Sequence, residues 1–429
     1  MKEPGLRPAE PHRHPPCRLG HNPGPQSDSC YVTAQPDRPV CSWPEGCDAT
    51  QASGYKLCFA HLNPDEFDQF LATLKPGADI DARSTTITAE RLDKLIDAVR
   101  DGRGVSIFGE VNFQEAEFEN VERIGPLTAS HLTLDGAKFS KFVRVQVMGF
   151  NVSCVATRFE GGVNLEGDHI TIDATSTTFG ADSTISDMRI SDRDAPIVRS
   201  LRNTDVSKLV LVNVNLEWCM FADARRLDQL RFEGHCRFRN PPNSWRWSPR
   251  RVLIEECGVR RWPIESPNDP SKFLPPHPGE TPERTATLYR SLRKAFEDSK
   301  NEAGAGDFYY GEMEMRRRSL ATSRAERWIL SSYWLLSGYG QRAGRALTAI
   351  GVLVVAVSVL LLTVGLPGEH VWTWVQVDQS ARIAMGAVVF RDAGQQLTPA
   401  GTWTVMIARF LGPVLLALAV LAVRTRVKR

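Results

Sequence analysis

The chain of 429 residues has no excess of charge of either sign and no apolar run near its start. It contains 52 basic and 50 acidic residues, so its overall charge indicates no polyelectrolyte as a partner. The first 40 residues include nine prolines and lack the apolar segment of a secretory signal peptide. We therefore expect a disordered, proline-rich tail over residues 1–35.

Catalytic motifs are also lacking. Glu255 and Glu256, and the adjacent pair His235 and Cys236, have no nucleophile, metal cluster or phosphate-binding loop near them in the pattern. We therefore expect no enzyme. Residues 105–240 hold 19 acidic against 15 basic residues, a surplus too small for a rod that imitates duplex DNA. No nucleic-acid partner is expected either.

Two apolar segments close the chain, at residues 346–366 and 403–423. Both are long enough to cross a bilayer as helices at 1.5 Å per residue. The first has no charged residue and no polar face. The second contains Arg409 and Pro413, so a buried core helix is an alternative for this segment alone. The pair predicts two transmembrane helices and the lipid bilayer as a partner.

The flanks of these segments predict their orientation. Arg342 and Arg345 precede the first span, and the basic tail 424–429 follows the second. Lys and Arg remain on the cytoplasmic side, so we expect a multi-pass protein of the cell inner (plasma) membrane with both termini in the cytoplasm. Residues 367–402 would then form an extracytoplasmic loop. This loop has no Thr-x-Gly-Tyr-Gly run, and therefore no potassium-channel filter.

A cytoplasmic location argues against disulfide bonds among the nine cysteines. Residues 36–64 instead contain a Cys-x5-Cys-x10-Cys-x2-His array made of Cys41, Cys47, Cys58 and His61. Thiolates and one imidazole suit tetrahedral zinc, and four protein ligands leave no open position for catalysis. The array predicts a structural zinc site. The alternative is a loop with spare thiols.

Between residues 105 and 240, large apolar residues recur every five positions, whereas helices repeat every 3.6 residues and strands every two. Smaller or branched apolar residues often lie two places before each large one, as Val111 and Ala116 do before Phe113 and Phe118. The expected core residues are Phe108, Phe113, Phe118, Leu134, Phe139, Phe159, Phe179, Leu201, Val206, Leu211, Leu216 and Phe221.

This pattern resembles that of pentapeptide-repeat proteins. The resemblance implies a β-solenoid, a right-handed quadrilateral β-helix in which each five residues form one face and roughly seven coils of about twenty residues stack along an axis. The period is degenerate, because Arg123, Arg144 and Asn164 stand where apolar residues are expected. An antiparallel β-sandwich is the alternative, although it does not account for three runs of five-residue spacing.

Helices are predicted on both sides of the solenoid. "TAERLDKLIDAVRDG" indicates a helix that begins after Thr88 and ends near Gly102, within a helical cap at residues 65–104. A linker at 241–280 separates the solenoid from a helical hairpin and juxtamembrane helix at 281–345, with "NEAGAGD" as the break between the hairpin helices.

The segments "YRSLRKAFED…GAGDFYYGEMEMRR", "WILSSYWLLSGYGQRAGRAL" and "RFLGPVLLALAVLAVRTRVKR" resemble a group of actinobacterial membrane proteins. These proteins join pentapeptide repeats to two C-terminal transmembrane helices. The likeness implies this architecture over about residues 65–429. It says little about activity.

The sequence therefore predicts a membrane-anchored cytoplasmic scaffold that binds a protein partner through its β-helix. The alternative is a pore-forming or transport-related subunit, a homo-oligomer with a degenerate two-helix channel-like membrane domain, which would need an ordered 367–402 loop. Basic residues before the first span are expected to contact anionic lipid: Arg316, Arg317, Arg318, Arg324, Arg327, Arg342 and Arg345.

Overall fold

The structure is a computed structural model that describes residues 38–102, 104–188, 195–242, 250–265, 273–274, 279–367, 373–389 and 396–427. The tail expected at 1–35 lies outside the described residues, as do parts of the expected linker at 241–280 and of the expected loop at 367–402. The chain from Val40 onward forms one unit.

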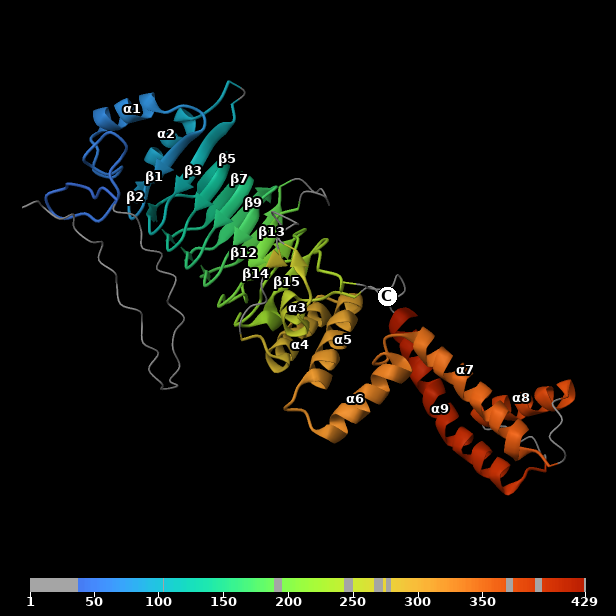
Figure 1. The fold of residues 1–429 in the computed structure, drawn as a ribbon. Coiled ribbons are helices and arrows are strands. Elements are labelled where there is room, and N and C mark those ends of the chain that lie inside the picture. The colour runs from blue at the N-terminus through green and yellow to red at the C-terminus, as the bar shows by residue number, and fades with distance from the viewer. Residues whose placement is uncertain are drawn as a thin grey trace, which may run out of the picture. The chain divides into compact units, whose positions relative to one another are not determined.

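A parallel β-solenoid of about six turns occupies the middle of the chain (Figure 1). Its strands are β1 (Ala78–Asp81), β2 (Thr86–Thr88), β3 (Ser106–Asn112), β4 (Glu117–Glu119), β5 (Arg123–Thr133), β6 (Lys138–Phe139), β7 (Val143–Ser153), β8 (Arg158–Phe159), β9 (Val163–Asp168), β10 (Thr171–Asp173), β11 (Thr178–Phe179), β12 (Ser183–Asp187), β13 (Ile197–Ser200), β14 (Leu209–Val212) and β15 (Arg231–Glu233).

These strands form two parallel sheets. One has the order β1-β3-β5-β7-β9-β12-β14-β15, with β10 paired to β7 and β13; the other has the order β11-β8-β6-β4-β2. Each strand pairs with strands of the neighbouring coils, so the backbone hydrogen bonds run along the stack and each coil covers the core of the next. The β-sandwich alternative, which requires antiparallel sheets, is therefore wrong.

One corner of the coil recurs throughout the stack. It is occupied by residues with positive φ, namely Ser84, Glu115, Gly136, Ala156, Ser176, Asn203 and Asp223. In the first six corners, the N–H of this residue donates to the carbonyl of the residue that precedes the corner of the next coil, as from Glu115 to Asp135 at 2.7 Å. The spacing is 20 or 21 residues except in two intervals, which contain the helix after β2 and residues 189–194. The coil length is thus about twenty residues, with two insertions.

The core of the solenoid is built from columns of like side chains. All twelve residues expected in the core are buried. Phe118, Phe139, Phe159 and Phe179 stack in one column, with ring-centroid distances of 4.3, 5.0 and 6.1 Å between successive rings. These distances are close to the roughly 4.8 Å separation of paired strands, so the stacking follows directly from the register of the coils.

Replacing Phe139, which stacks on a ring at each side, with Leu is expected to destabilise the solenoid by about 1–2 kcal/mol. Denaturation of the detergent-solubilised chain, followed by circular dichroism, measures the effect. The matched control is Phe142→Leu, because that side chain is 49% exposed and the change is expected to stay within about 0.5 kcal/mol. Equal effects of the two changes would show that the column does not stabilise the fold.

The interruptions of the five-residue period lie on β5, β7 and β9. Arg123 pairs with Arg144, and Arg144 with Asn164, in one column across β5, β7 and β9. The residues that follow them, Ile124 and Val145 among them, are buried. On these strands the side chains alternate between inside and outside with a period of two, so the polar residues form an outward row.

The N-terminal end differs in part from the expected helical cap at 65–104. Helix α1 (Pro64–Thr73) begins at a capping box made by Asn63 and Glu66. Strands β1 and β2 pair with β3 and β4, so the solenoid begins at Ala78 rather than at residue 105. Helix α2 (Ala89–Ala98) follows Thr88 as expected, but it is an insertion between the first two coils.

The C-terminal end of the solenoid is covered by α3 (Ile254–Arg260) and by an antiparallel pair, α4 (Pro282–Asp298) and α5 (Glu302–Arg318). The prediction that "NEAGAGD" breaks the hairpin was wrong, because α5 already begins at Glu302. Gly304 and Gly311 lie inside α5, where a Cβ atom would approach Phe296 and Tyr289 of α4 to 2.3 and 2.4 Å. These glycines permit close helix packing rather than a break.

The remaining helices are α6 (Arg324–Ser337), α7 (Ala343–Leu360) with its π-helical end η2 (Leu361–Gly365), α8 (Trp374–Val388) and α9 (Pro399–Val427). Two segments, Ala343–Gly365 and Pro399–Arg424, are long and apolar enough to cross a membrane. Helix α8 comes from the loop expected between them. Its buried Ile383, Ala384 and Ala387 belong to one apolar cluster with residues of α7 and α9.

Candidate functional site

Residues 40–62, called the knuckle below, bring three cysteines and a histidine together. An antiparallel bridge between Val40 and Thr50 places Cys41 beside Ala49, whose carbonyl accepts a hydrogen bond of 2.9 Å from the Cys41 N–H. A turn then carries Cys47 back towards Cys41. At the other end, the N–H of His61 donates to the carbonyl of Cys58 at 3.0 Å, so both side chains emerge from a single turn.

The four side chains fit the geometry of a zinc site. Their ligand atoms all lie within 4.8 Å of one another. His61 Nδ1 is 3.5 Å from Cys41 Sγ and 3.3 Å from Cys58 Sγ, and the Sγ atoms of Cys47 and Cys58 are 3.9 Å apart. Tetrahedral zinc with ordinary bond lengths requires S–N edges of about 3.6 Å and S–S edges of about 3.8 Å. The cluster is therefore already preformed for a tetrahedral ion.

The surroundings of the thiols also suit a cation. The N–H of Cys58 donates to Cys41 Sγ at 3.2 Å. Burial opposes ionisation of Cys41, but hydrogen bonds from the backbone of Cys58 and Trp43 outweigh it and lower the pKa of this thiol. Burial raises the pKa of Cys58 to about 12, so only a bound cation would keep this thiol ionised at neutral pH.

The knuckle is fixed to the first coil of the solenoid. The N–H of Thr50 donates to the carbonyl of Arg83 at 3.1 Å. Arg91, on α2, donates to the carbonyls of Phe59 and Leu62, the latter at 2.7 Å. Phe59 and Leu62 are buried in the same core as the solenoid. The knuckle therefore covers the first coil, and the four possible metal ligands lie within this covering loop.

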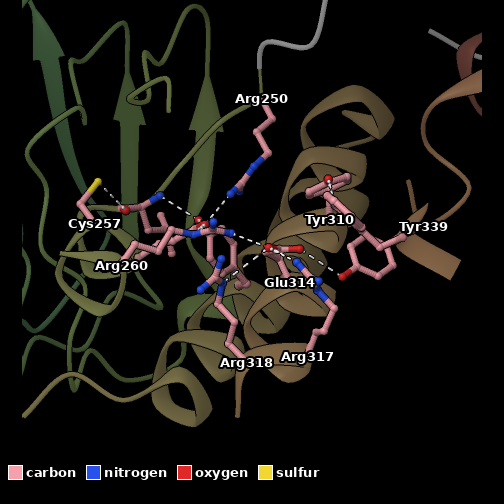
Figure 2. Close-up of polar contacts among 12 residues, drawn as sticks. Arg250, Cys257, Arg260, Tyr310, Glu314, Arg317, Arg318 and Tyr339 are labelled. Carbon is pink, nitrogen blue, oxygen red and sulfur yellow. Dashed lines mark hydrogen bonds and ion pairs between the residues drawn. The ribbon is translucent and has the colours of Figure 1, made fainter. Parts of the chain in front are cut away.

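A second group of polar side chains, centred on two buried carboxylates, lies where the solenoid meets the helices (Figure 2). We call it the polar junction; it comprises Arg250, Glu256, Arg260, Tyr289, Glu314, Arg317, Arg318 and Tyr339. Glu256 is fully buried, with Arg260 Nε at 2.5 Å, the Tyr289 hydroxyl at 2.5 Å, and Arg250 donating to the same carboxylate.

Glu314 of α5 is the second acceptor of the polar junction. Its Oε1 lies 2.8 Å from Arg260, 2.7 Å from Arg317 and 3.6 Å from Arg318, and its Oε2 accepts from the Tyr339 hydroxyl at 3.1 Å. Arg260 bridges the two carboxylates. The polar junction thus connects α3, α4 and α5 with Tyr339, four residues before α7.

Glu255, next to Glu256, has a different environment. Its carboxylate accepts from the N–H of Phe221, and burial raises its pKa to about 7. Burial and the charge of Glu255 raise the pKa of Glu280 to about 8. A carboxyl with a raised pKa favours the folded state while it is protonated. The contribution of Glu255 to the free energy of unfolding is therefore fully present below its usual pKa of 4.5 and is lost as the pH rises through about 7.

The expected lipid-contacting arginines occupy four environments. Arg317 and Arg318 belong to the polar junction, and Arg316 pairs with Glu326 at 2.8 Å. Arg342 lies over the Tyr310 ring at 4.9 Å, and Arg345 over the Trp334 ring at 4.7 Å. Arg324 and Arg327 line an open groove between the end of α5 and the start of α6.

The polar junction was missed at the sequence level, where residues 241–280 are interpreted as a linker. A signal was present, because Glu255 and Glu256 stand between the basic pairs Arg250–Arg251 and Arg260–Arg261. Opposite charges at this spacing, next to an apolar run, are compatible with a buried network.

Comparisons of the chain with models of protein families, with curated proteins and with solved structures find no match. The functional argument therefore rests on the geometry described above.

Proposed function

We propose that the protein is a non-catalytic scaffold, anchored in the cell inner (plasma) membrane, that binds a protein partner along its solenoid. The supporting observation is a row of exposed side chains beside the phenylalanine column. Glu117, Lys138 and Arg158 occupy equivalent positions on β4, β6 and β8, in register from coil to coil. A rigid surface with both signs of charge at a fixed repeat favours recognition of a protein rather than of a polyanion.

The proposal includes the finer identity of the fold. A coil of about twenty residues divides into four faces of five, which supports a right-handed pentapeptide β-helix of the kind found in actinobacterial membrane proteins. It also includes one structural zinc ion held by Cys41, Cys47, Cys58 and His61. The fit of their separations to a tetrahedron supports this assignment.

The partner is tested by proximity labelling in the native membrane, with the labelling enzyme fused to the full-length chain. Changing Lys138 and Arg158 to Glu reverses the charge of the exposed row and is expected to remove the partner from the labelled set. The matched control changes Arg123 and Arg231, which are exposed on β5 and β15 of the other sheet, to Glu. The solenoid surface is not the binding site if both variants label the same proteins as the native chain.

The membrane topology is tested separately. The basic flanks favour a cytoplasmic location for both termini, so reporter fusions after Pro39 and Arg429 are expected to read cytoplasmic, and a fusion after Val389 external. A cytoplasmic signal after Val389 would contradict the multi-pass arrangement.

A pore-forming subunit is a second candidate, and α8 favours it. An ordered helix from the loop between the spans packs against α7 and α9 through Ile383 and Ala387. Such a helix is what an oligomeric pore would require and an anchor would not. Ion flux through liposomes that contain the purified chain tests this candidate. Flux no greater than that of empty liposomes would contradict it.

A further inference from the structure

An open groove of about 420 Å³ lies where α5 is followed by α6. It is lined by Arg317 and Arg318 from the last turn of α5 and by Arg324, Arg327, Trp328 and Ser331 from the first two turns of α6. Four guanidinium groups, a tryptophan and a hydroxyl therefore surround one opening. Guanidinium groups donate paired hydrogen bonds to phosphate oxygens, which makes this donor set suitable for a phosphate group.

The positive charge of the groove is only partly balanced within the protein. Arg317 and Arg318 share the carboxylate of Glu314 with Arg260. Among the residues that the structure describes, no carboxylate forms an ion pair with Arg324 or Arg327. Arg324 is also exposed. The groove therefore has excess positive charge, which an anion from outside the protein would balance.

The apolar surface beside the groove indicates where that anion comes from. On α6, Trp328 is 76% exposed, Ile329 68% and Leu335 66%. Only residues 338–342 separate α6 from Ala343, the first residue of the first apolar span. Tryptophan is enriched at the headgroup level of bilayers, and a helix with basic and large apolar side chains suits the membrane surface.

We propose that this groove binds the phosphate of an anionic glycerophospholipid, with the guanidinium groups of Arg324 and Arg327 as its main donors and Trp328 against the glycerol region. The proposal rests on the membrane embedding of α7 and α9 proposed above. It does not depend on the protein partner. It also divides the seven basic residues expected to contact lipid: Arg324 and Arg327 bind it directly, whereas Arg316, Arg342 and Arg345 have contacts within the protein.

The test uses the full-length chain in a neutral detergent, titrated with phosphatidylglycerol or phosphatidylcholine and analysed by native mass spectrometry. We expect one tightly bound phosphatidylglycerol and no comparable phosphatidylcholine. Changing Arg324 and Arg327 to Gln should weaken phosphatidylglycerol binding at least tenfold, since each basic residue near an anionic headgroup contributes about one kilocalorie per mole. The control, Arg225→Gln with Arg231→Gln, removes the same charge from the solenoid and should bind like the native chain.

Three results would overturn the proposal: unchanged phosphatidylglycerol binding by the Arg324 and Arg327 variant, equal binding of phosphatidylcholine, or displacement of the lipid by inorganic phosphate at equal concentration. The last result would assign the groove to a free anion. The membrane embedding is checked independently, by retention of the native chain in membranes after an alkaline wash. Its release would remove the proposed anchor itself, whereas retention with no lipid selectivity would remove only the groove.

Discussion

Changing Cys58 to Ser and His61 to Ala together is expected to abolish binding of one equivalent of zinc and to unfold the knuckle. Zinc binding in small Cys/His sites contributes apparent free energies of about 10–16 kcal/mol at neutral pH, more than a loop of this size gains from packing. The knuckle has only a small apolar cluster of its own, formed around Cys41, Ala49 and Cys58. Elemental analysis of the purified full-length chain measures the metal, and limited proteolysis measures the loss of structure.

The matched control for the zinc experiment is Cys236→Ser, which changes a half-buried thiol outside the metal cluster and should retain the zinc. Treatment of the native chain with a strong chelator should reproduce the proteolysis of the double variant. A chain that contains no zinc and still protects residues 40–62 from protease would contradict the assignment. Because the thiolates must be deprotonated to bind metal, zinc should also be released on acidification.

Changing Glu256 to Ala is expected to destabilise the folded chain by about 3–5 kcal/mol, because it leaves buried positive charge without its counterion. Arg250 and Arg260 both pair with this carboxylate, and their side chains are only 7% and 13% exposed. Thermal denaturation of the detergent-solubilised chain measures the loss. The comparison is Glu217→Ala, which breaks a surface ion pair with Arg237 and should cost at most about 1 kcal/mol.

The effect of Glu256 also depends on pH. Burial opposes ionisation, but Arg250, Arg260 and the Tyr289 hydroxyl hold the pKa of Glu256 below its usual 4.5. A carboxyl with a lowered pKa stabilises the fold above its unfolded pKa, and this contribution is lost as the pH falls through the folded value. The difference in free energy of unfolding between the native chain and the Glu256 variant should therefore be largest at neutral pH and decrease below pH 4.5. A difference that does not change with pH would show that the carboxylate acts only by packing.

The solenoid core could be predicted because the sequence spacing of its core residues repeats with the length of the coil. Phe118, Phe139, Phe159 and Phe179 differ by 20 or 21 residues, which is the length of one turn, so their periodicity is visible without any structure. On β5 and β7 the strands extend to eleven residues and a period of two replaces the period of five. The polar residues on these strands break the five-residue pattern in the sequence, but in the structure they form one regular row that faces outward.

The metal ligands could be predicted in part, since Cys58 and His61 are close along the chain. Whether Cys41 and Cys47 join them depends on the bridge between Val40 and Thr50, a tertiary contact that spacing does not reveal. For the polar junction the sequence shows the charge pattern around Glu255 and Glu256 but not its burial. Charged residues are mostly exposed, and the burial of Glu256 becomes visible only in the fold, where Tyr289 of α4 donates to it and Glu314 of α5 shares Arg260 with it.

Each end of the solenoid is covered by its own segment. Coils could therefore be added in the middle without a change in the contacts at either end. The knuckle contacts only the first coils, and the helical pair packs on the last. A duplicated segment of about twenty residues, inserted between the corners at Gly136 and Ala156, would add one ring to the phenylalanine column and lengthen the stack by about 4.8 Å. An engineered chain could therefore be lengthened by whole coils of fixed height, with the knuckle at one end and the helical pair at the other left unchanged.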